Sequence, residues 1–131
     1  MEIKTLHSGD ILFRQGEQEA CMYEVYGGRI GIYSKYDTPE QSLLAEYIQD
    51  MTFGEMGLLD HAPRSATAVA LDNETSVAVV TEETFGEYFQ KNPGRVLLLM
   101  QQMCHNLRRR TKEYMELCGE IRELAGKEAQ K

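Results

Sequence analysis

The sequence predicts a mainly β protein, a sandwich or jelly-roll barrel, with helices at its C-terminal end. In the first eighty residues, short apolar segments alternate with turn residues at hairpin spacing. Many short strands with regular turns are typical of antiparallel sandwiches and barrels rather than of parallel sheets. From Thr81 onward the apolar residues recur at helical spacing. The 131 residues leave room for one domain and an appendage, but not for two full domains.

Six strands are expected before Thr81. Gly16 follows the first of them, in a turn where glycine can adopt a positive φ. Gly27 and Gly28 stand between two apolar segments and give a two-residue hairpin signal. Residues 72–74, Asp-Asn-Glu, form a further turn. The expected strands span residues 11–13, 22–26, 29–33, 42–48, 65–70 and 76–80.

Two helices are expected after the strands. Thr81 can cap the first, which runs to about residue 90 and has two glutamates in its first turn, where the helix dipole favours negative charge. Asn92 and Pro93 restart the chain as the N-cap and first residue of the second helix. This helix extends to about residue 125, a length of roughly 33 residues or ~50 Å.

The long helix carries an apolar seam of the kind that pairs helices in coiled coils. Its members follow alternating steps of four and three residues, and all but one are apolar or aromatic. The first three turns can also pack on the helix's own domain. Beyond Leu107 a second copy of the helix is the simpler partner, so we expect a symmetric parallel homodimer through residues 93–125. The seam comprises Val96, Met100, Met103, Leu107, Arg110, Tyr114, Leu117, Ile121 and Leu124.

A short segment between the fourth and fifth expected strands collects groups that suit an anionic sugar phosphate. Residues 53–59, Phe-Gly-Glu-Met-Gly-Leu-Leu, are followed by residues 63–67, Pro-Arg-Ser-Ala-Thr. A cyclic phosphodiester fused to a ribose needs a planar donor fork and backbone amides for its anion, and a charged acceptor for its 2′-hydroxyl. Glycine lets the backbone approach the phosphate, because no Cβ intervenes. Taken singly, Glu55 and Arg64 would equally suit a surface ion pair, but together the residues favour an anion site.

This segment resembles the phosphate-binding cassette of cyclic-nucleotide-binding domains of the catabolite activator protein type. The resemblance implies a double-stranded β-helix, or jelly roll, followed by a long dimerisation helix. It also implies that Glu55 accepts a hydrogen bond from the ribose hydroxyl, and that Arg64, assisted by the hydroxyl of Ser65, binds the exocyclic phosphate oxygens. The main-chain amides that the family uses lie around Gly54, Met56 and Gly57.

Arg110 is the one charged residue of the seam, where an unpaired charge would be costly to bury. One explanation is that its side chain extends to a neighbouring carboxylate or to water. The resemblance suggests another, because the family's central helix brings polar side chains against the purine, and Arg110 and Thr111 lie at that level. Resembling proteins usually carry hydroxyl residues there, so an arginine leaves the preferred base open.

Composition excludes several other classes of protein. The net charge of −7 argues against non-specific nucleic-acid binding, which depends on Lys and Arg neutralising phosphates. The N-terminus has no apolar run, so neither a signal peptide nor a membrane span is expected. The three cysteines are far apart, which is typical of reduced thiols in a cytoplasmic protein. The three histidines do not cluster either, so no metal site is expected.

The sequence therefore predicts a cytoplasmic sensor of a cyclic AMP-like nucleotide, with a binding domain at residues 1–92 and a dimerisation helix at residues 93–131. The cyclic AMP preference follows from the resemblance of Arg-Ser-Ala to bacterial members of the family. No helix-turn-helix domain is expected. The chain would then be either a stand-alone sensor that acts on a protein effector or a regulator reduced to its effector half, in transcriptional or signalling regulation. A barrel enzyme acting on a small anion is disfavoured, because no nucleophile–base pair or metal set is present. The main alternative is a dimeric interaction module that has the fold but binds no nucleotide.

Overall fold

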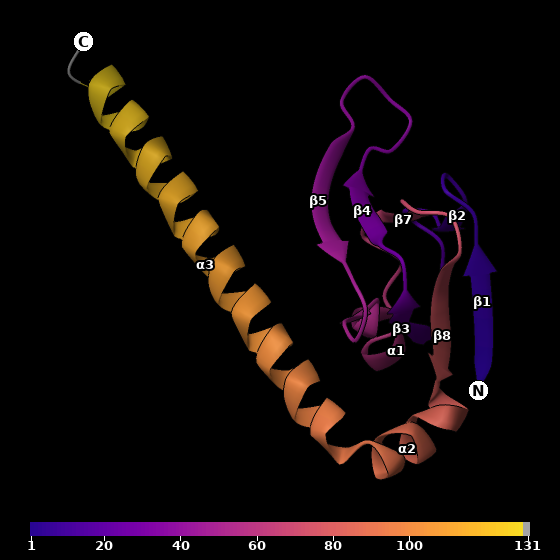
Figure 1. Cartoon of the computed structure of the whole chain (residues 1–131). Coiled ribbons are helices and arrows are strands. Elements are labelled where there is room, and N and C mark those ends of the chain that lie inside the picture. Colours follow the sequence, from indigo (N-terminus) through magenta and orange to yellow (C-terminus); the bar gives the residue numbers. More distant parts are fainter. Residues whose placement is uncertain (130–131) are drawn as a thin grey trace. The chain divides into compact units, whose positions relative to one another are not determined.

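The computed structural model describes residues 1–129, and the chain divides into two compact units between Lys91 and Asn92. The first unit is a sandwich of two four-stranded antiparallel sheets, with two short helices (Figure 1). The second unit is a single long helix. The predicted mainly β fold with a long C-terminal helix is therefore confirmed.

The two sheets have the strand orders β1-β8-β3-β6 and β2-β7-β4-β5. Apart from β4 and β5, which pair with each other, strands that follow one another in the chain belong to different sheets, so most pairings join segments that are distant in sequence. The strands are β1 (Glu2–Leu6), β2 (Ile11–Phe13), β3 (Cys21–Gly27), β4 (Ile30–Ser34), β5 (Ser42–Tyr47), β6 (Thr52–Phe53), β7 (Thr67–Ala70) and β8 (Thr75–Thr81).

The core lies between the sheets, and β3 contributes most to it. β3 pairs with both β8 and β6, and the side chains of Tyr23 and Val25 are fully buried. The rings of Phe13, Tyr23 and Phe53 pack together with centroids 5.4–6.2 Å apart. Burial of each such side chain stabilises the fold by roughly 1.5–3 kcal/mol. Two members of this cluster, Phe13 and Tyr23, also face the guanidinium of Arg64.

The predicted hairpin at Gly27 and Gly28 is wrong. β3 and β4 belong to different sheets, so these glycines carry the chain from one sheet to the other. Gly28 has a φ of 72°, and a Cβ on it would lie 2.8 Å from the Cα of Thr75. Glycine is therefore required here by close packing against β8, and a turn signal in the sequence cannot distinguish the two uses of glycine.

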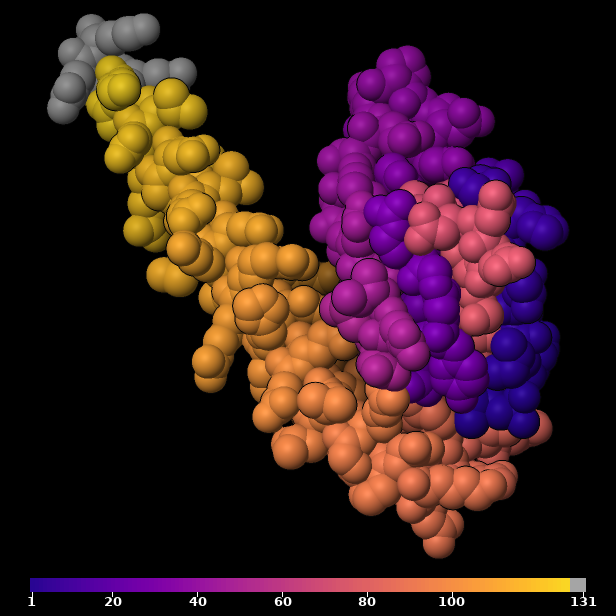
Figure 2. Space-filling view, viewed as in Figure 1, coloured from indigo at the N-terminus to yellow at the C-terminus, as the bar shows by residue number. Residues whose placement is uncertain are grey.

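Three elements were not predicted: β1, β6 and the short helix α1 (Glu55–Leu59). β1 is the edge strand beside β8, and its exposed and half-buried side chains give little apolar alternation. β6 has only two residues, too few to show any period. The strand predicted at residues 65–70 begins later, at Thr67. The loop predicted between β4 and β5 is present, and Figure 2 shows it (violet) projecting from the sandwich.

The predicted helix starts are confirmed. α2 spans Glu82–Lys91, and the Thr84 amide donates to Oγ1 of Thr81 at 3.3 Å, while the Thr81 amide donates to Oγ1 of Thr84 at 2.9 Å. This reciprocal pair satisfies a helix-end amide that would otherwise lack a partner. α3 spans Pro93–Ala129. No helix among residues 1–129 is both long and apolar enough to cross a bilayer.

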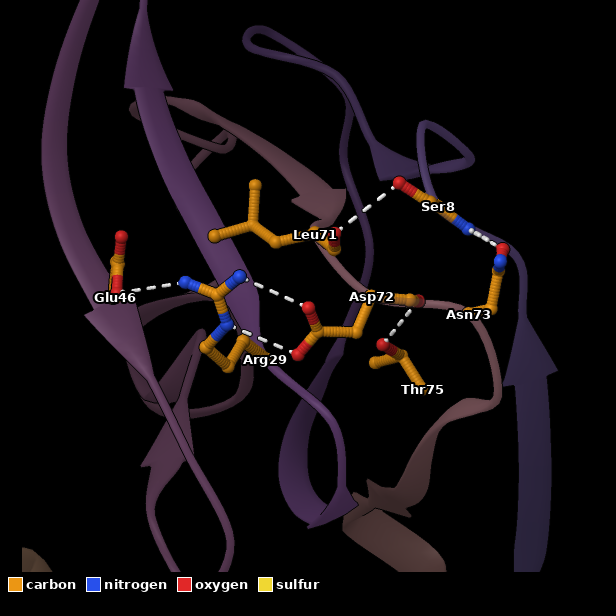
Figure 3. A network of polar contacts seen from close by, with 7 residues as sticks. All are labelled: Ser8, Arg29, Glu46, Leu71, Asp72, Asn73 and Thr75. Atoms are coloured by element: carbon orange, nitrogen blue, oxygen red, sulfur yellow. Dashed lines mark hydrogen bonds and ion pairs between the residues drawn. The ribbon is translucent and has the colours of Figure 1, made fainter.

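A polar network ties the turn before β8 to the rest of the sandwich (Figure 3). Asp72 accepts two hydrogen bonds from Arg29, at 3.0 Å from Nε and 2.9 Å from Nη2, and Arg29 also lies 3.6 Å from Glu46 of β5. On the other side of the turn, Ser8 donates its amide to Asn73 at 3.0 Å. The hydrogen bonds from Arg29, opposed by partial desolvation, lower the pKa of the Asp72 carboxyl.

We expect the ion pair of Asp72 to make stability depend on pH. Because the folded-state pKa of Asp72 is lowered, its contribution is present above the unfolded-state pKa and is lost as the pH falls through the folded-state value. Asp72→Asn should therefore lower the melting temperature at pH 7 but not at pH 3. Asp37→Asn, which removes an exposed carboxylate that has no ion pair within residues 1–129, should have no such pH-dependent effect. Equal profiles for the two variants would contradict this account.

Candidate functional site

The cassette predicted from the sequence connects β6 of one sheet to β7 of the other. β6 ends at Phe53, Gly54 adopts a left-handed conformation with φ 75°, and α1 begins at Glu55. The chain then passes through a loop to Arg64 before entering β7 at Thr67. The positive φ at Gly54 turns the chain sharply, a conformation that glycine adopts without steric cost.

Arg64 is the centre of this segment, and its side chain points into the sandwich. The residue is only 5% exposed. Nη1 donates to the carbonyl of Gly54 and Nη2 to the carbonyl of Cys21, both at 2.8 Å. The guanidinium also lies over the ring of Phe13, with Cζ 4.4 Å from the ring centroid, and faces Tyr23 at 5.7 Å. Backbone carbonyls thus accept hydrogen bonds from the guanidinium, and aromatic rings pack against its face. Both contacts suit a planar, delocalised cation.

The charge of Arg64 is only partly compensated. Its nearest carboxylate is that of Glu19, with Oε2 3.6 Å from Nη2, which is longer than a hydrogen bond. Nε is buried and donates to no acceptor among the described residues. A buried cation needs a charge partner and acceptors for each N–H group. The site therefore contains a buried positive charge with donor capacity left over, and this is a feature that favours anion binding.

The two cassette glycines are close to this cation. A Cβ at Gly54 would lie 2.8 Å from Nη1 of Arg64, and one at Gly57 would lie 2.6 Å from the same atom and 2.7 Å from the carbonyl oxygen of Glu19. The structure thus brings Gly54, Gly57 and Arg64 together. The amide of Gly57 is already engaged, since it donates to the Gly54 carbonyl at 3.2 Å.

The other predicted site residues are placed less directly. Glu55 is half-buried at the start of α1, and its carboxylate makes no hydrogen bond or ion pair within residues 1–129. Met56 is 44% exposed, and Ser65 is exposed just before β7. Arg110 and Thr111 lie on α3, in the second unit; both are exposed, and Thr111 donates its hydroxyl to the carbonyl of Leu107 at 2.8 Å. Their role in ligand binding stays a prediction.

Several residues around Arg64 were not predicted from the sequence. Phe13, Glu19, Cys21 and Tyr23 all lie more than forty positions upstream of Arg64, and no local motif marks them. The Tyr23 hydroxyl donates to Glu19 at 2.7 Å, and burial raises the pKa of that phenol. Burial also raises the pKa of the Cys21 thiol, an effect that a hydrogen bond with Tyr23 and the nearby Arg64 cation offset only in part. The site is therefore a joint product of β3 and the cassette.

Among residues 1–129, the structure places no three His, Cys, Asp or Glu side chains where they could hold a metal ion. The described part of the candidate site offers a ligand the positive charge and the N–H groups of Arg64.

Comparison with known proteins identifies the family. The family model described as "Cyclic nucleotide-binding domain" matches residues 3–92. The crystal structure of the catabolite activator protein of Thermus thermophilus is similar to this chain, with a TM-score of 0.76 and 26% sequence identity. The matched region covers 88% of this chain and 54% of that protein's chain. The chain belongs to the cyclic nucleotide-binding domain family.

Two further relatives are larger proteins that contain a similar domain. The cAMP-bound form of the EAL enzyme Bd1971 is 32% identical in sequence, with a TM-score of 0.60, and the match covers 82% of this chain and 28% of that enzyme's chain. Its cGMP-bound form has the same sequence identity and a TM-score of 0.59. Patatin-like phospholipase domain-containing protein 6 of Pongo abelii is 29% identical over 106 residues, which are 78% of this chain and 8% of that protein. This chain therefore spans only a small part of these relatives.

The crowding at Gly57 gives a test of the site's geometry. We expect Gly57→Ala to destabilise the fold by about 1–3 kcal/mol, because its Cβ must displace Arg64 or the backbone at Glu19. Gly86→Ala is the matched control: Gly86 is also helical, and its Cβ would meet nothing within 4 Å. It should stabilise the fold by roughly 0.5–1 kcal/mol. Urea unfolding of both variants measures this, and similar effects in the two would refute the packing described here.

Proposed function

We propose that this chain is a sensor of a cyclic AMP-like nucleotide, a binding module rather than an enzyme, that acts in the cytoplasm. The observation that carries the proposal is the buried guanidinium of Arg64, whose Nε has no acceptor within residues 1–129 and whose charge is only partly balanced. A cyclic phosphate supplies one negative charge and acceptor oxygens, and charge-assisted hydrogen bonds are the strong ones. Membership of the family and similarity to the cAMP-bound and cGMP-bound forms of Bd1971 support this ligand class.

In this proposal the two ends of the cassette bind different parts of the ligand. Arg64 exchanges part of its carbonyl contacts for phosphate oxygens, assisted by Ser65 and by main-chain amides around Gly54, Met56 and Gly57, of which the Gly57 amide must first leave the Gly54 carbonyl. Glu55, whose carboxylate is uncommitted within residues 1–129, accepts a hydrogen bond from the ribose 2′-hydroxyl. Arg110 or Thr111 contacts the base from the long helix.

We further propose that the protein is a homodimer that pairs through α3. The seam from Leu107 to Leu124 leaves large apolar side chains in water, interrupted only by Arg110: Leu107, Tyr114, Leu117, Ile121 and Leu124 are 53–68% exposed in the single chain. Large exposed apolar stripes on a helix are covered by partners. Ligand binding would favour one arrangement of the two helices, and a protein effector would receive this shift in population. With a net charge of −7, binding of nucleic acid is not part of the proposal.

Isothermal titration with cyclic AMP and cyclic GMP tests the ligand. Wild type should bind at least one of them and gain melting temperature by mass action. Arg64→Lys keeps the charge but loses the planar fork, and should weaken binding about 10- to 100-fold, equivalent to roughly 1.5–3 kcal/mol. Arg14→Ala, an exposed arginine of the same unit, should bind as wild type does. If neither nucleotide binds to folded wild type, the interaction-module alternative replaces this proposal.

Sedimentation equilibrium tests the dimer. Leu117→Glu places a charge in the seam and should convert the dimer to monomer, because burying the new carboxylate is unfavourable. Met115→Glu is the control, since Met115 is 67% exposed on the same helix but lies outside the seam. That variant should remain a dimer. A monomeric wild type, or dissociation of both variants alike, would contradict pairing through the seam.

A further inference from the structure

The loop that carries Glu19 is fixed against the backbone of Arg64. The amide of Gly16 donates to the Arg64 carbonyl, and the amide of Arg64 donates to the Glu17 carbonyl, both at 2.8 Å. The carbonyl oxygen of Glu19 itself lies 2.7 Å from the position that a Cβ on Gly57 would take. The loop between β2 and β3 therefore forms one wall of the cassette, although it is distant from the cassette in the sequence.

The carboxylate of Glu19 is held beside the guanidinium by a third group. Oε2 accepts a hydrogen bond from the Tyr23 hydroxyl at 2.7 Å and lies 3.6 Å from Nη2 of Arg64. The Glu19 side chain is 30% exposed, whereas that of Arg64 is 3% exposed. Glu19 is thus the side of the ion pair that water and ligands can reach, and Tyr23 fixes its position.

This ion pair is suited to replacement by an anion. At 3.6 Å it has the attraction of opposite charges without a direct hydrogen bond. A phosphate oxygen could approach the guanidinium to hydrogen-bond distance and would then be a stronger partner. A carboxylate retained beside the phosphate would repel it, and partial burial makes that repulsion larger than it would be in water.

We propose that Glu19 is the counter-ion of Arg64 in the ligand-free protein and that a bound phosphate displaces it. Glu19 then lowers the affinity for every nucleotide that presents an anionic phosphate at Arg64, whatever its base. Its effect is on ligand affinity, through the charge and position of Arg64. This inference rests on the proposed function, since it concerns the phosphate end of the same site.

The experiment compares Glu19→Gln with Glu17→Gln. Both remove one negative charge from the same loop; at Glu17 the new amide oxygen can still accept from the Arg14 amide, as the carboxylate does now. Glu19→Gln should bind cyclic AMP and cyclic GMP about three- to tenfold more tightly than wild type by isothermal titration. Glu17→Gln should change the dissociation constant less than twofold.

The outcomes separate the inference from the function on which it rests. If wild type and Glu19→Gln both bind nucleotide with the same affinity, or the variant binds more weakly, the site stands and the role of Glu19 is overturned. If neither protein binds either nucleotide, the proposed function fails. In both cases a double-mutant cycle of Glu19→Gln and Arg64→Lys, measured by urea unfolding without ligand, determines whether the two side chains are coupled. If the changes in the free energy of unfolding are additive, Glu19 is not the counter-ion of Arg64.

Discussion

The guanidinium of Arg64 lies inside a β sandwich, and much of the surrounding structure is what such a burial requires. A cation removed from water needs acceptors in its plane and apolar surface against its faces. The carbonyls of Gly54 and Cys21 and the ring of Phe13 provide them. Gly57 must lack a side chain because the cation occupies the space that a Cβ would take. The cassette glycines, the aromatic contact of Phe13 and the partial counter-charge of Glu19 thus follow from one buried charge.

β3 connects this charge to the rest of its unit. Cys21 accepts a hydrogen bond from Arg64, and Tyr23 packs in the aromatic core. Glu24, the next residue, points to the opposite face of the strand and accepts a hydrogen bond from Tyr88 of α2 at 2.5 Å. A ligand that moved Arg64 would therefore act on a strand that is hydrogen-bonded to α2, the element that precedes the long helix. This contiguous set of contacts gives the proposed population shift a physical route within the first unit.

Features encoded by neighbouring residues were predicted well from the sequence. The start of α2 depends on Thr81 and Thr84, three positions apart, and the start of α3 on the Asn92-Pro93 pair. The cassette is also compact in sequence, so Gly54, Gly57 and Arg64 could be selected before their contacts were known. The edge strand β1 and the two-residue β6 were missed, because an edge strand shows weak alternation and two residues show none.

By itself, the sequence determined the family, the residues of the cassette and the helical register of the C-terminal segment, since each depends on residue types at short, fixed spacings. Only the tertiary structure decided that Gly28 crosses between sheets instead of closing a hairpin, and that Glu19 and Phe13 meet Arg64. Strand pairing joins segments separated by tens of residues, and the partner of a buried charge is chosen by that pairing. Local sequence patterns therefore do not predict which distant side chain will lie beside the buried charge.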